Sequence, residues 1–369
     1  MLTMILAVLL NVNAMEDNMI EIGTRMELHS TILDEDRTIL VGLPYGYAES
    51  QQSYPLLIVL DGGTPTSLAH AVSTMEMLDG KSLAPQMIVA GIATGNGVRD
   101  YFPLPIEGRP ESGHADRFLG FIIEELIPHL ESEYRVAPCR VLYGGSNAGM
   151  FLVNAMLQDP ESFSGYIAAS PSLGWFPDFF REGLSDFVPS GDTRLYLNWG
   201  SDDLQSIVLS ATPELAADLE SAFADSGSYR YQVLQDGGHV PYISLYSGLE
   251  WVFQGWRMAD STLLEGGLTA LDEHYAGLSD QYGFEVPVPA GKYMTLGQHL
   301  LRGGDFEAAG EVFSAYSISW PGSSRAAFFL GEAHRLLGNT QEAIDCYTRA
   351  QELDPDFAPA GARIRSLQE

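Results

Sequence analysis

The sequence contains little cysteine and few basic side chains. Its 369 residues include two cysteines, Cys139 and Cys346, which lie so far apart that neither a disulfide framework nor a zinc-binding pattern is expected. Lys and Arg together number 19 against 49 Asp and Glu, which gives a formal net charge of −30. Phosphate backbones and anionic membrane surfaces repel such a protein. The composition therefore argues against a nucleic-acid or anionic-lipid partner.

Long apolar stretches are also scarce. Residues 2–10 are nearly all apolar, and the small residues at 12–14 resemble a signal-peptide cleavage site, although the usual positive charge is missing. The segment is too short to cross a bilayer as a helix, and no other stretch predicts a membrane span. Residues 1–14 are therefore interpreted as a signal peptide, with a buried N-terminal helix as the alternative. The first interpretation predicts a periplasmic or secreted protein, and the second a cytoplasmic one.

The rest of the composition is that of a globular protein. Hydrophobic residues make up 46% of the chain, and its length suits one large domain and a smaller one. After an antiparallel strand pair expected at residues 26–43, short apolar runs alternate with helical patterns. These runs are typical of parallel strands buried on both faces, and they lie at residues 56–60, 86–92, 166–171, 195–199 and 229–234. The pattern predicts an α/β fold with a mostly parallel, doubly wound sheet over residues 15–258.

One further apolar run leads directly into a glycine-rich hexapeptide, Gly144-Gly145-Ser146-Asn147-Ala148-Gly149. A serine flanked by small residues between a strand and a helix is typical of a nucleophile elbow, a strained turn that exposes the serine hydroxyl. The residues two before and two after the serine must then be small, as Gly144 and Ala148 are. An ordinary glycine-rich loop is the alternative that this stretch alone leaves open.

Residues after two later strands favour the elbow. A serine hydroxyl needs a base to take its proton, and the base needs an acid to orient it. Asp203 follows the run at 195–199 and His239 follows the run at 229–234, in the order Ser, Asp, His that α/β-hydrolases show. Ligands bind at the carboxyl ends of parallel strands, where all three residues would meet. Asp203 is preferred to Asp202 for its spacing from the preceding glycine, with Asp202 kept as the alternative.

Backbone N–H groups are expected to form an oxyanion hole beside the serine. One is expected from Asn147, directly after the nucleophile. The other is expected from the turn after the strand at 56–60, where Gly62 and Gly63 are equally good candidates.

A long connection rich in Gly and Pro, residues 94–113, follows the second parallel strand. Loops of this length that lack secondary structure are usually functional or mobile. Arg99 and Tyr101 are its candidate substrate-pocket residues, with surface contacts as the alternative.

Taken together, these stretches resemble the esterases of the α/β-hydrolase superfamily that include siderophore esterases of the enterobactin type and relatives of S-formylglutathione hydrolase. The resemblance spans residues 26–256 and rests on 54–62, 99–103, 144–149, 169–173 and 239–241. It implies that Ser146, Asp203 and His239 form the triad. Many relatives have Gly-His-Ser-x-Gly-Gly, whereas this sequence has Gly145 before the serine and Ala148 after it. Both residues are small enough for the turn, so the difference bears on substrate preference.

The C-terminal third contains an internal repeat. Five features of the sequence recur 34 residues later along the chain. Leu296-Gly297 corresponds to Leu330-Gly331, Gly304 to Gly338, Ala309 to Ala343, Phe313 to Tyr347 and Pro321 to Pro355. Offset and pattern are those of the tetratricopeptide repeat, a pair of antiparallel helices per unit. Two repeats are predicted at 290–369, after a helical linker at 259–289. So short an array leaves apolar faces to cover, which predicts a protein partner or self-association, with a packing role as the alternative.

The sequence thus predicts a serine esterase that hydrolyses carboxylic esters through an acyl-enzyme, without a metal or cofactor. Its substrate would be a small-molecule ester, of the siderophore type that the resemblance implies or another small acyl ester. An anionic ferric siderophore would need a basic patch, for which Arg99 is a candidate. The alternatives are an acyltransferase with the same triad, or a repeat-based interaction protein with a vestigial hydrolase domain.

Overall fold

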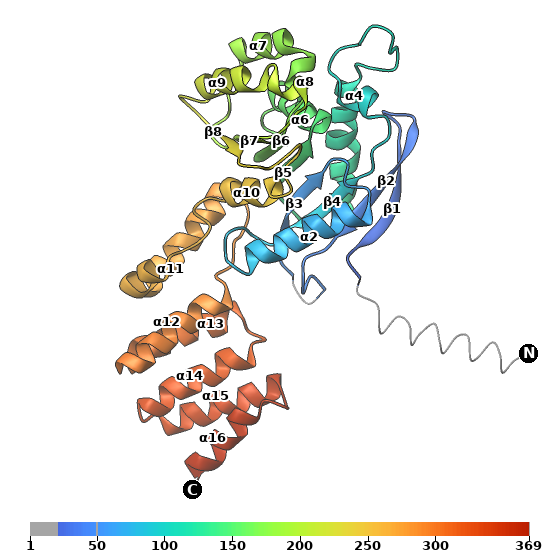
Figure 1. The fold of residues 1–369 in the computed structure, drawn as a ribbon. Coiled ribbons are helices and arrows are strands. Elements are labelled where there is room, and N and C mark those ends of the chain that lie inside the picture. Colours follow the sequence, from blue (N-terminus) through green and yellow to red (C-terminus); the bar gives the residue numbers. More distant parts are fainter. Residues whose placement is uncertain (1–20, 49–50, 369) are drawn as a thin grey trace, which may run out of the picture. The chain divides into compact units, whose positions relative to one another are not determined.

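The computed structural model describes residues 21–48 and 51–368, and the chain divides into two compact units, residues 1–256 and 257–369 (Figure 1). The predicted signal peptide lies outside the described residues. Across the described ranges, no helix combines the length and the apolar character that crossing a membrane requires.

The first unit is built on an eight-stranded sheet with the order β1-β2-β4-β3-β5-β6-β7-β8 (Figure 1). The strands are β1 (Thr24–Ser30), β2 (Glu35–Gly42), β3 (Tyr54–Val59), β4 (Ile88–Ile92), β5 (Val136–Gly145), β6 (Gly165–Ala169), β7 (Arg194–Gly200) and β8 (Ser228–Leu234). β1 and β2 pair antiparallel, as do β2 and β4, and every pair from β4 to β8 is parallel. The predicted α/β fold is confirmed, with the antiparallel strands at one edge.

Helices cover both faces of this sheet. One face packs against α4 (Ala115–Gly120), α5 (Ile127–Glu133), α6 (Asn147–Gln158), α7 (Pro177–Asp186) and α9 (Thr212–Ala222). The other face carries α2 (Pro65–Asp79) and α10 (Ser244–Val252), where Gly248 lies against the Ile167 side chain so closely that a Cβ would overlap it. The central strands are buried on both faces because both helix layers are present, which explains their unbroken apolar runs.

Two segments differ from the elements predicted for them. The connection at 94–113 contains a short helix, α3 (Gly97–Tyr101), whose N-cap is Asn96. For residues 118–134 the apolar pattern predicts one amphipathic helix that kinks at Pro128. This segment instead adopts π-helical geometry over Phe121–Leu126, so that the Ile127 N–H bonds to the Ile122 carbonyl five residues back. In a regular α-helix, proline lacks the N–H for a hydrogen bond and collides with the carbonyl four residues before it. The wider π-helical turn directly precedes Pro128.

The second unit consists of helices: α11 (Asp260–Tyr282), α12 (Ala290–Gly303), α13 (Phe306–Ser319), α14 (Ser324–Leu336), α15 (Thr340–Leu353) and α16 (Ala358–Gln368) (Figure 1). The repeat positions have matching roles. A Cβ at Gly297 would lie 2.4 Å from Phe313 Cζ, and one at Gly331 would lie 2.7 Å from Tyr347 Cε1. Each glycine thus lets an aromatic ring of the paired helix pack on the backbone, which explains why both recur.

Candidate active site

Ser146 lies at the point where β5 gives way to α6. Its backbone has φ 56° and ψ −120°, a conformation that non-glycine residues rarely adopt. The strained residue is held from both sides, since its N–H donates to the Ala169 carbonyl at 2.8 Å and its own carbonyl accepts from the Met150 N–H at 3.0 Å. This geometry is that of a nucleophile elbow at the carboxyl end of the sheet.

The small residues around Ser146 are required by close packing. A Cβ at Gly144 would lie 2.9 Å from the Ala148 Cβ, so the elbow closes only with small residues at both positions. A Cβ at Gly145 would lie 2.5 Å from Val240 Cγ1. The position that a Cβ would take at residue 145 is therefore already filled by the side chain of the residue after His239.

His239 and Asp203 are brought together by the turns after β8 and β7. His239 Nδ1 lies 2.9 Å from Asp203 Oδ2, and the Asp203 side chain is completely buried. Burial opposes ionisation of this carboxyl group, but hydrogen bonds from His239, from the Gln205 N–H and from Ser170 outweigh it and lower the Asp203 pKa. Asp202 has a different contact, because its Oδ1 accepts the Gly238 N–H at 2.6 Å.

Ser146 and His239 line one cavity of about 310 Å³. Its other lining residues are Val59, Leu60, Asp61, Ser67, His70, Ala71, Tyr143, Gly145, Val240 and Leu245. The volume is at the small end of the range for ligand pockets. Ser146 Oγ lies 3.3 Å from the hydroxyl of the buried Ser172. The cavity thus exposes a serine hydroxyl and an imidazole, while the carboxylate lies buried behind the imidazole.

The turn after β3 adjoins the cavity, since Asp61 is one of the residues that line it. A Cβ at Gly62 would lie 2.6 Å from Gly91 Cα, and one at Gly63 would lie 2.2 Å from Ala93 Cα, so both glycines are needed where β3 and β4 end. Asn147 is the first residue of α6, and the first N–H groups of a helix have no partner within it. Asn147, Gly62 and Gly63 are not among the residues that line the cavity, and their N–H groups stay the predicted donors to a developing oxyanion.

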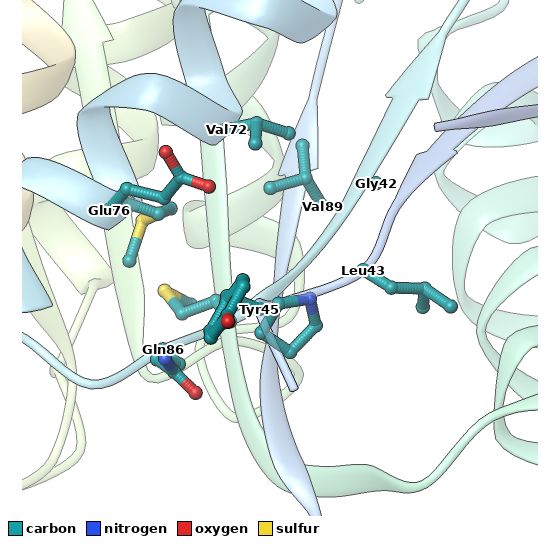
Figure 2. A pocket seen from close by; sticks show the side chains of 10 residues that line it. Gly42, Leu43, Tyr45, Val72, Glu76, Gln86 and Val89 are labelled. Carbon is teal, nitrogen blue, oxygen red and sulfur yellow. The ribbon is translucent and has the colours of Figure 1, made fainter. Parts of the chain in front are cut away.

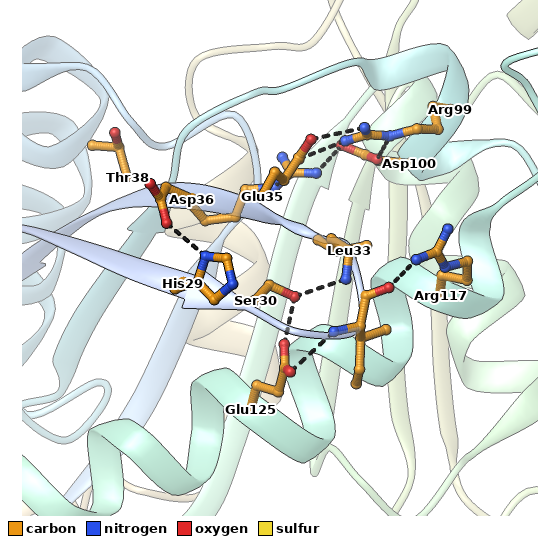
Figure 3. A network of polar contacts seen from close by, with 12 residues as sticks. His29, Ser30, Leu33, Glu35, Asp36, Thr38, Arg99, Asp100, Arg117 and Glu125 are labelled. Atoms are coloured by element: carbon orange, nitrogen blue, oxygen red, sulfur yellow. Dashed lines mark hydrogen bonds and ion pairs between the residues drawn. The ribbon is translucent and has the colours of Figure 1, made fainter.

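Neither Arg99 nor Tyr101 is among the residues that line the cavity. Arg99 Nη2 pairs with Glu35 Oε1 at 2.6 Å and its Nε with Asp100 Oδ1 at 2.7 Å, in a network that links α3 to β2 (Figure 3). The buried Arg37 binds the other oxygen of Asp100 at 2.6 Å. The Arg99 guanidinium is therefore already occupied by carboxylates.

Tyr101 acts on the cavity through a neighbour. Its hydroxyl donates to Asp61 Oδ1 at 2.7 Å, and the Thr94 hydroxyl bonds to the same oxygen. Asp61 has a positive φ of 55° and lines the cavity directly before Gly62. The two hydroxyl groups thus hold a strained residue in place next to the expected oxyanion donors.

His70, Ser170 and Ser172 are not among the site residues that the sequence predicts. His70 lines the cavity, its ring centroid lies 3.9 Å from that of Tyr242, and burial lowers its pKa. Ser170 and Ser172 follow β6, the strand next to β5. The signal for them was available, because the end of β6 must lie beside the elbow in a parallel sheet.

A second, much smaller cavity of about 20 Å³ lies where β2 ends beside α2 (Figure 2). Its lining is mainly apolar and includes Leu43, Tyr45, Val72 and Val89, with Glu76 and Gln86 as polar members. It offers space for one water molecule and contains no nucleophile. The candidate site is therefore the cavity at Ser146.

Comparison with known sequences finds matches in both units. Residues 30–205 match a family described as "Putative esterase", and residues 294–356 match the tetratricopeptide repeat. The ferri-bacillibactin esterase BesA of Bacillus subtilis is 38% identical over 80 residues, which are 21% of this chain and 28% of that protein. A siderophore enterobactin esterase of Emericella nidulans is 42% identical over 81 residues, 20% and 27% of the two chains. The matched stretches thus span little more than a quarter of these relatives.

Solved structures show the same fold. An IroE-like serine hydrolase from Shewanella oneidensis superposes with a TM-score of 0.66 at 26% identity, over 80% of this chain and 99% of the other. An uncharacterised protein from Capnocytophaga ochracea also gives 0.66, at 21% identity, over 94% and 99%. Residues 30–205 therefore match the esterase family model within a unit that has the α/β-hydrolase fold, and residues 294–356 match the tetratricopeptide repeat.

Proposed function

We propose that this protein is a serine esterase that hydrolyses carboxylic esters through an acyl-enzyme intermediate. The observation that carries the proposal is the meeting of two features at one cavity: Ser146 on a strained elbow, and His239 bonded at 2.9 Å to the buried Asp203. A lone reactive serine would need no buried acid behind a histidine, whereas a triad does. The esterase family match over residues 30–205 supports the same reaction.

In the first half-reaction, Ser146 Oγ attacks the ester carbonyl carbon while His239 Nε2 takes the hydroxyl proton. In the tautomer that this role requires, Nδ1 donates its proton to Asp203, which leaves Nε2 to take the proton of the serine. The carbonyl oxygen becomes an oxyanion, which the Asn147 N–H and the N–H of Gly62 or Gly63 stabilise. The C–O bond then breaks, and the alcohol leaves with the proton from His239.

In the second half-reaction, a water molecule replaces the alcohol. His239 takes one proton from the water as its oxygen attacks the acyl carbon, and the same N–H groups hold the second oxyanion. Collapse of this intermediate releases the carboxylic acid and returns the proton to Ser146 Oγ. The steps consume one water and one ester and yield one alcohol and one acid.

The cavity favours small uncharged acyl groups. Its volume of about 310 Å³ is modest, and the single formal charge among its lining residues, apart from the histidines, is the Asp61 carboxylate. No Lys or Arg stands among those lining residues, and Arg99 is bound to Glu35 and Asp100. The siderophore esters named for the two sequence relatives are therefore the contrasting class to test.

The test is hydrolysis of p-nitrophenyl esters of increasing acyl length by wild-type protein and by Ser146→Ala, with one trilactone siderophore as an additional substrate. We expect turnover of the short esters, and a fall to near the uncatalysed rate in the variant, which keeps its fold because only a partly exposed hydroxyl is lost. Wild-type rates in the variant would overturn the proposal. Turnover confined to the siderophore would overturn the preference for small uncharged esters.

A further inference from the structure

Ser170 lies behind the triad and outside the cavity lining. It follows the last residue of β6, it is fully buried, and its φ of 44° is one that serine rarely adopts. Its N–H donates to the Asn198 carbonyl of β7 at 2.6 Å, which fixes the strained backbone to the sheet. Such conformations persist only where the surrounding structure determines them, and they gather at functional sites.

The Ser170 hydroxyl contacts both turns that carry the other triad members. Its Oγ accepts the N–H of Val240, the residue directly after His239, at 3.0 Å. The same hydroxyl hydrogen-bonds the Asp203 carboxylate, and this bond helps to lower the Asp203 pKa. One hydroxyl has a donor and two acceptor sites, so it can donate to Asp203 while it accepts from Val240.

Ala169, the residue before Ser170, contacts Ser146, the third member of the candidate triad. The Ala169 carbonyl accepts the Ser146 N–H at 2.8 Å. Val240 has a φ of 53°, which is unusual for a β-branched residue, so its bond to Ser170 holds a strained part of the turn after β8. The end of β6 therefore touches the segments of Ser146, Asp203 and His239 within two consecutive residues.

We propose that Ser170 is a positioning residue, whose hydroxyl fixes the turn of His239 against the carboxylate of Asp203 so that the imidazole faces Ser146. The inference rests on the proposed esterase function. Because Ser170 is buried outside the cavity, its loss should slow the chemical steps and leave substrate binding nearly unchanged.

The experiment compares Ser170→Ala with Ser244→Ala in the full-length protein. Ser244 is equally buried, and its hydroxyl bonds to Asn198 Oδ1 at 2.7 Å, so its replacement also removes a buried serine hydroxyl beside β7 while sparing the triad contacts. For Ser170→Ala we expect kcat to fall about ten- to hundredfold, since small displacements of reacting groups have effects of this size, with KM nearly constant. Ser244→Ala should lower the melting temperature and keep the wild-type kcat.

A spectroscopic signal reports the contact without turnover. The proton that His239 Nδ1 shares with Asp203 gives a low-field resonance in histidine-labelled protein, and we expect it to broaden or shift in Ser170→Ala and to stay unchanged in Ser244→Ala. Ser170→Gly is the second variant, because glycine tolerates the positive φ and also lacks the hydroxyl.

Three results would overturn the inference: wild-type kcat and resonance in Ser170→Ala, the same in Ser170→Gly, or an equal loss of kcat in Ser244→Ala. A wild-type protein that hydrolyses no ester would instead overturn the proposed function. In that case the resonance would still show whether Ser170 holds His239 against Asp203.

Discussion

Val240 Cγ1 occupies the space in which a side chain at residue 145 would begin, at 2.5 Å from an ideal Cβ. Val240, which follows the candidate base His239, thus limits the size of the side chain at position 145, directly before the candidate nucleophile. Any residue larger than glycine at position 145 would therefore overlap the Val240 side chain. The two positions form one packing unit.

Gly145→Ala should destabilise the protein by roughly 1 to 3 kcal/mol, the range for overpacking a closed site, and should lower kcat because Val240 adjoins His239. Thermal unfolding and ester hydrolysis would measure the two effects. Gly191→Ala is the control, since a Cβ at that exposed glycine meets no atom within 4 Å. Combining Gly145→Ala with Val240→Ala should restore part of the lost stability, and strictly additive effects would contradict the contact.

Asp203→Asn should lower kcat by about 10⁴-fold, because an amide stabilises the wrong tautomer of the histidine. Asp202→Asn should keep kcat within a few-fold of wild type, since the amide oxygen can still accept the Gly238 N–H. Steady-state hydrolysis of one ester by both variants tests the choice between the two aspartates. The opposite ranking would move the acid role to Asp202.

Tyr101→Phe removes one of the two hydroxyl groups that bond Asp61 Oδ1, which loosens the turn before Gly62. A hydrogen bond of this kind is worth about 0.5 to 1.5 kcal/mol, so kcat should fall about three- to tenfold. Tyr229→Phe is the control because the buried Tyr229 hydroxyl has no hydrogen-bond partner among the described residues. Equal losses in both variants would show that Asp61 needs no anchoring by Tyr101.

The second unit should show acid-dependent stability through Glu332. Burial disfavours the charge of this carboxyl group, but hydrogen bonds from Arg335, Tyr347 and Arg363 outweigh burial and lower its pKa. A lowered folded-state pKa stabilises the fold above the unfolded pKa, and this stability is lost as the pH falls through the folded value. Glu332→Gln should therefore destabilise the unit at neutral pH, by roughly 1 to 3 kcal/mol, and much less below about pH 4.

Hydrogen exchange of peptides from α14 and α15 in the full-length protein would measure this difference at pH 7 and at acid pH. Glu352→Gln is the control, because Glu352 pairs with Arg349 on an exposed surface where an ion pair contributes little. A Glu332→Gln effect that stays constant down to acid pH would contradict the ionic origin.

Much of the fold could be predicted from sequence because burial leaves a local record. Strands that are covered on both faces have unbroken apolar sequences. Glycine recurs at positions 297 and 331 because an aromatic ring packs on the backbone at each of them. The turns with Ser146, Asp203 and His239 could be placed on one edge because parallel strands end together. Each of these features is determined by residues that lie close together in the sequence.

Features that depend on contacts between distant segments could not be read in this way. The π-helical turn at Phe121–Leu126 precedes Pro128, but nothing in the local pattern distinguishes it from the kink that we predicted. Arg99 was a candidate for the pocket, yet its charge is used by Glu35, a partner on a strand 64 residues earlier. Ser170 could be placed at the edge of the sheet from its position after β6, but its bonds to the turns of Asp203 and His239 could not be predicted, because they form only where three turns converge.

The backbone of the site also predicts how the protein would respond to selection for heat resistance. Of the seven non-glycine residues with positive φ in the described ranges, five lie in turns at the carboxyl edge of the sheet: Asp61, Ser146, Ser170, Asp236 and Val240. Each conformation opposes folding by an amount that glycine would relieve. Screening random variants for stability alone should therefore enrich glycine at these positions and yield proteins that survive heating but have lost turnover. An engineering effort that aims to keep activity should leave these five positions unchanged and seek stability elsewhere in the sheet and helices.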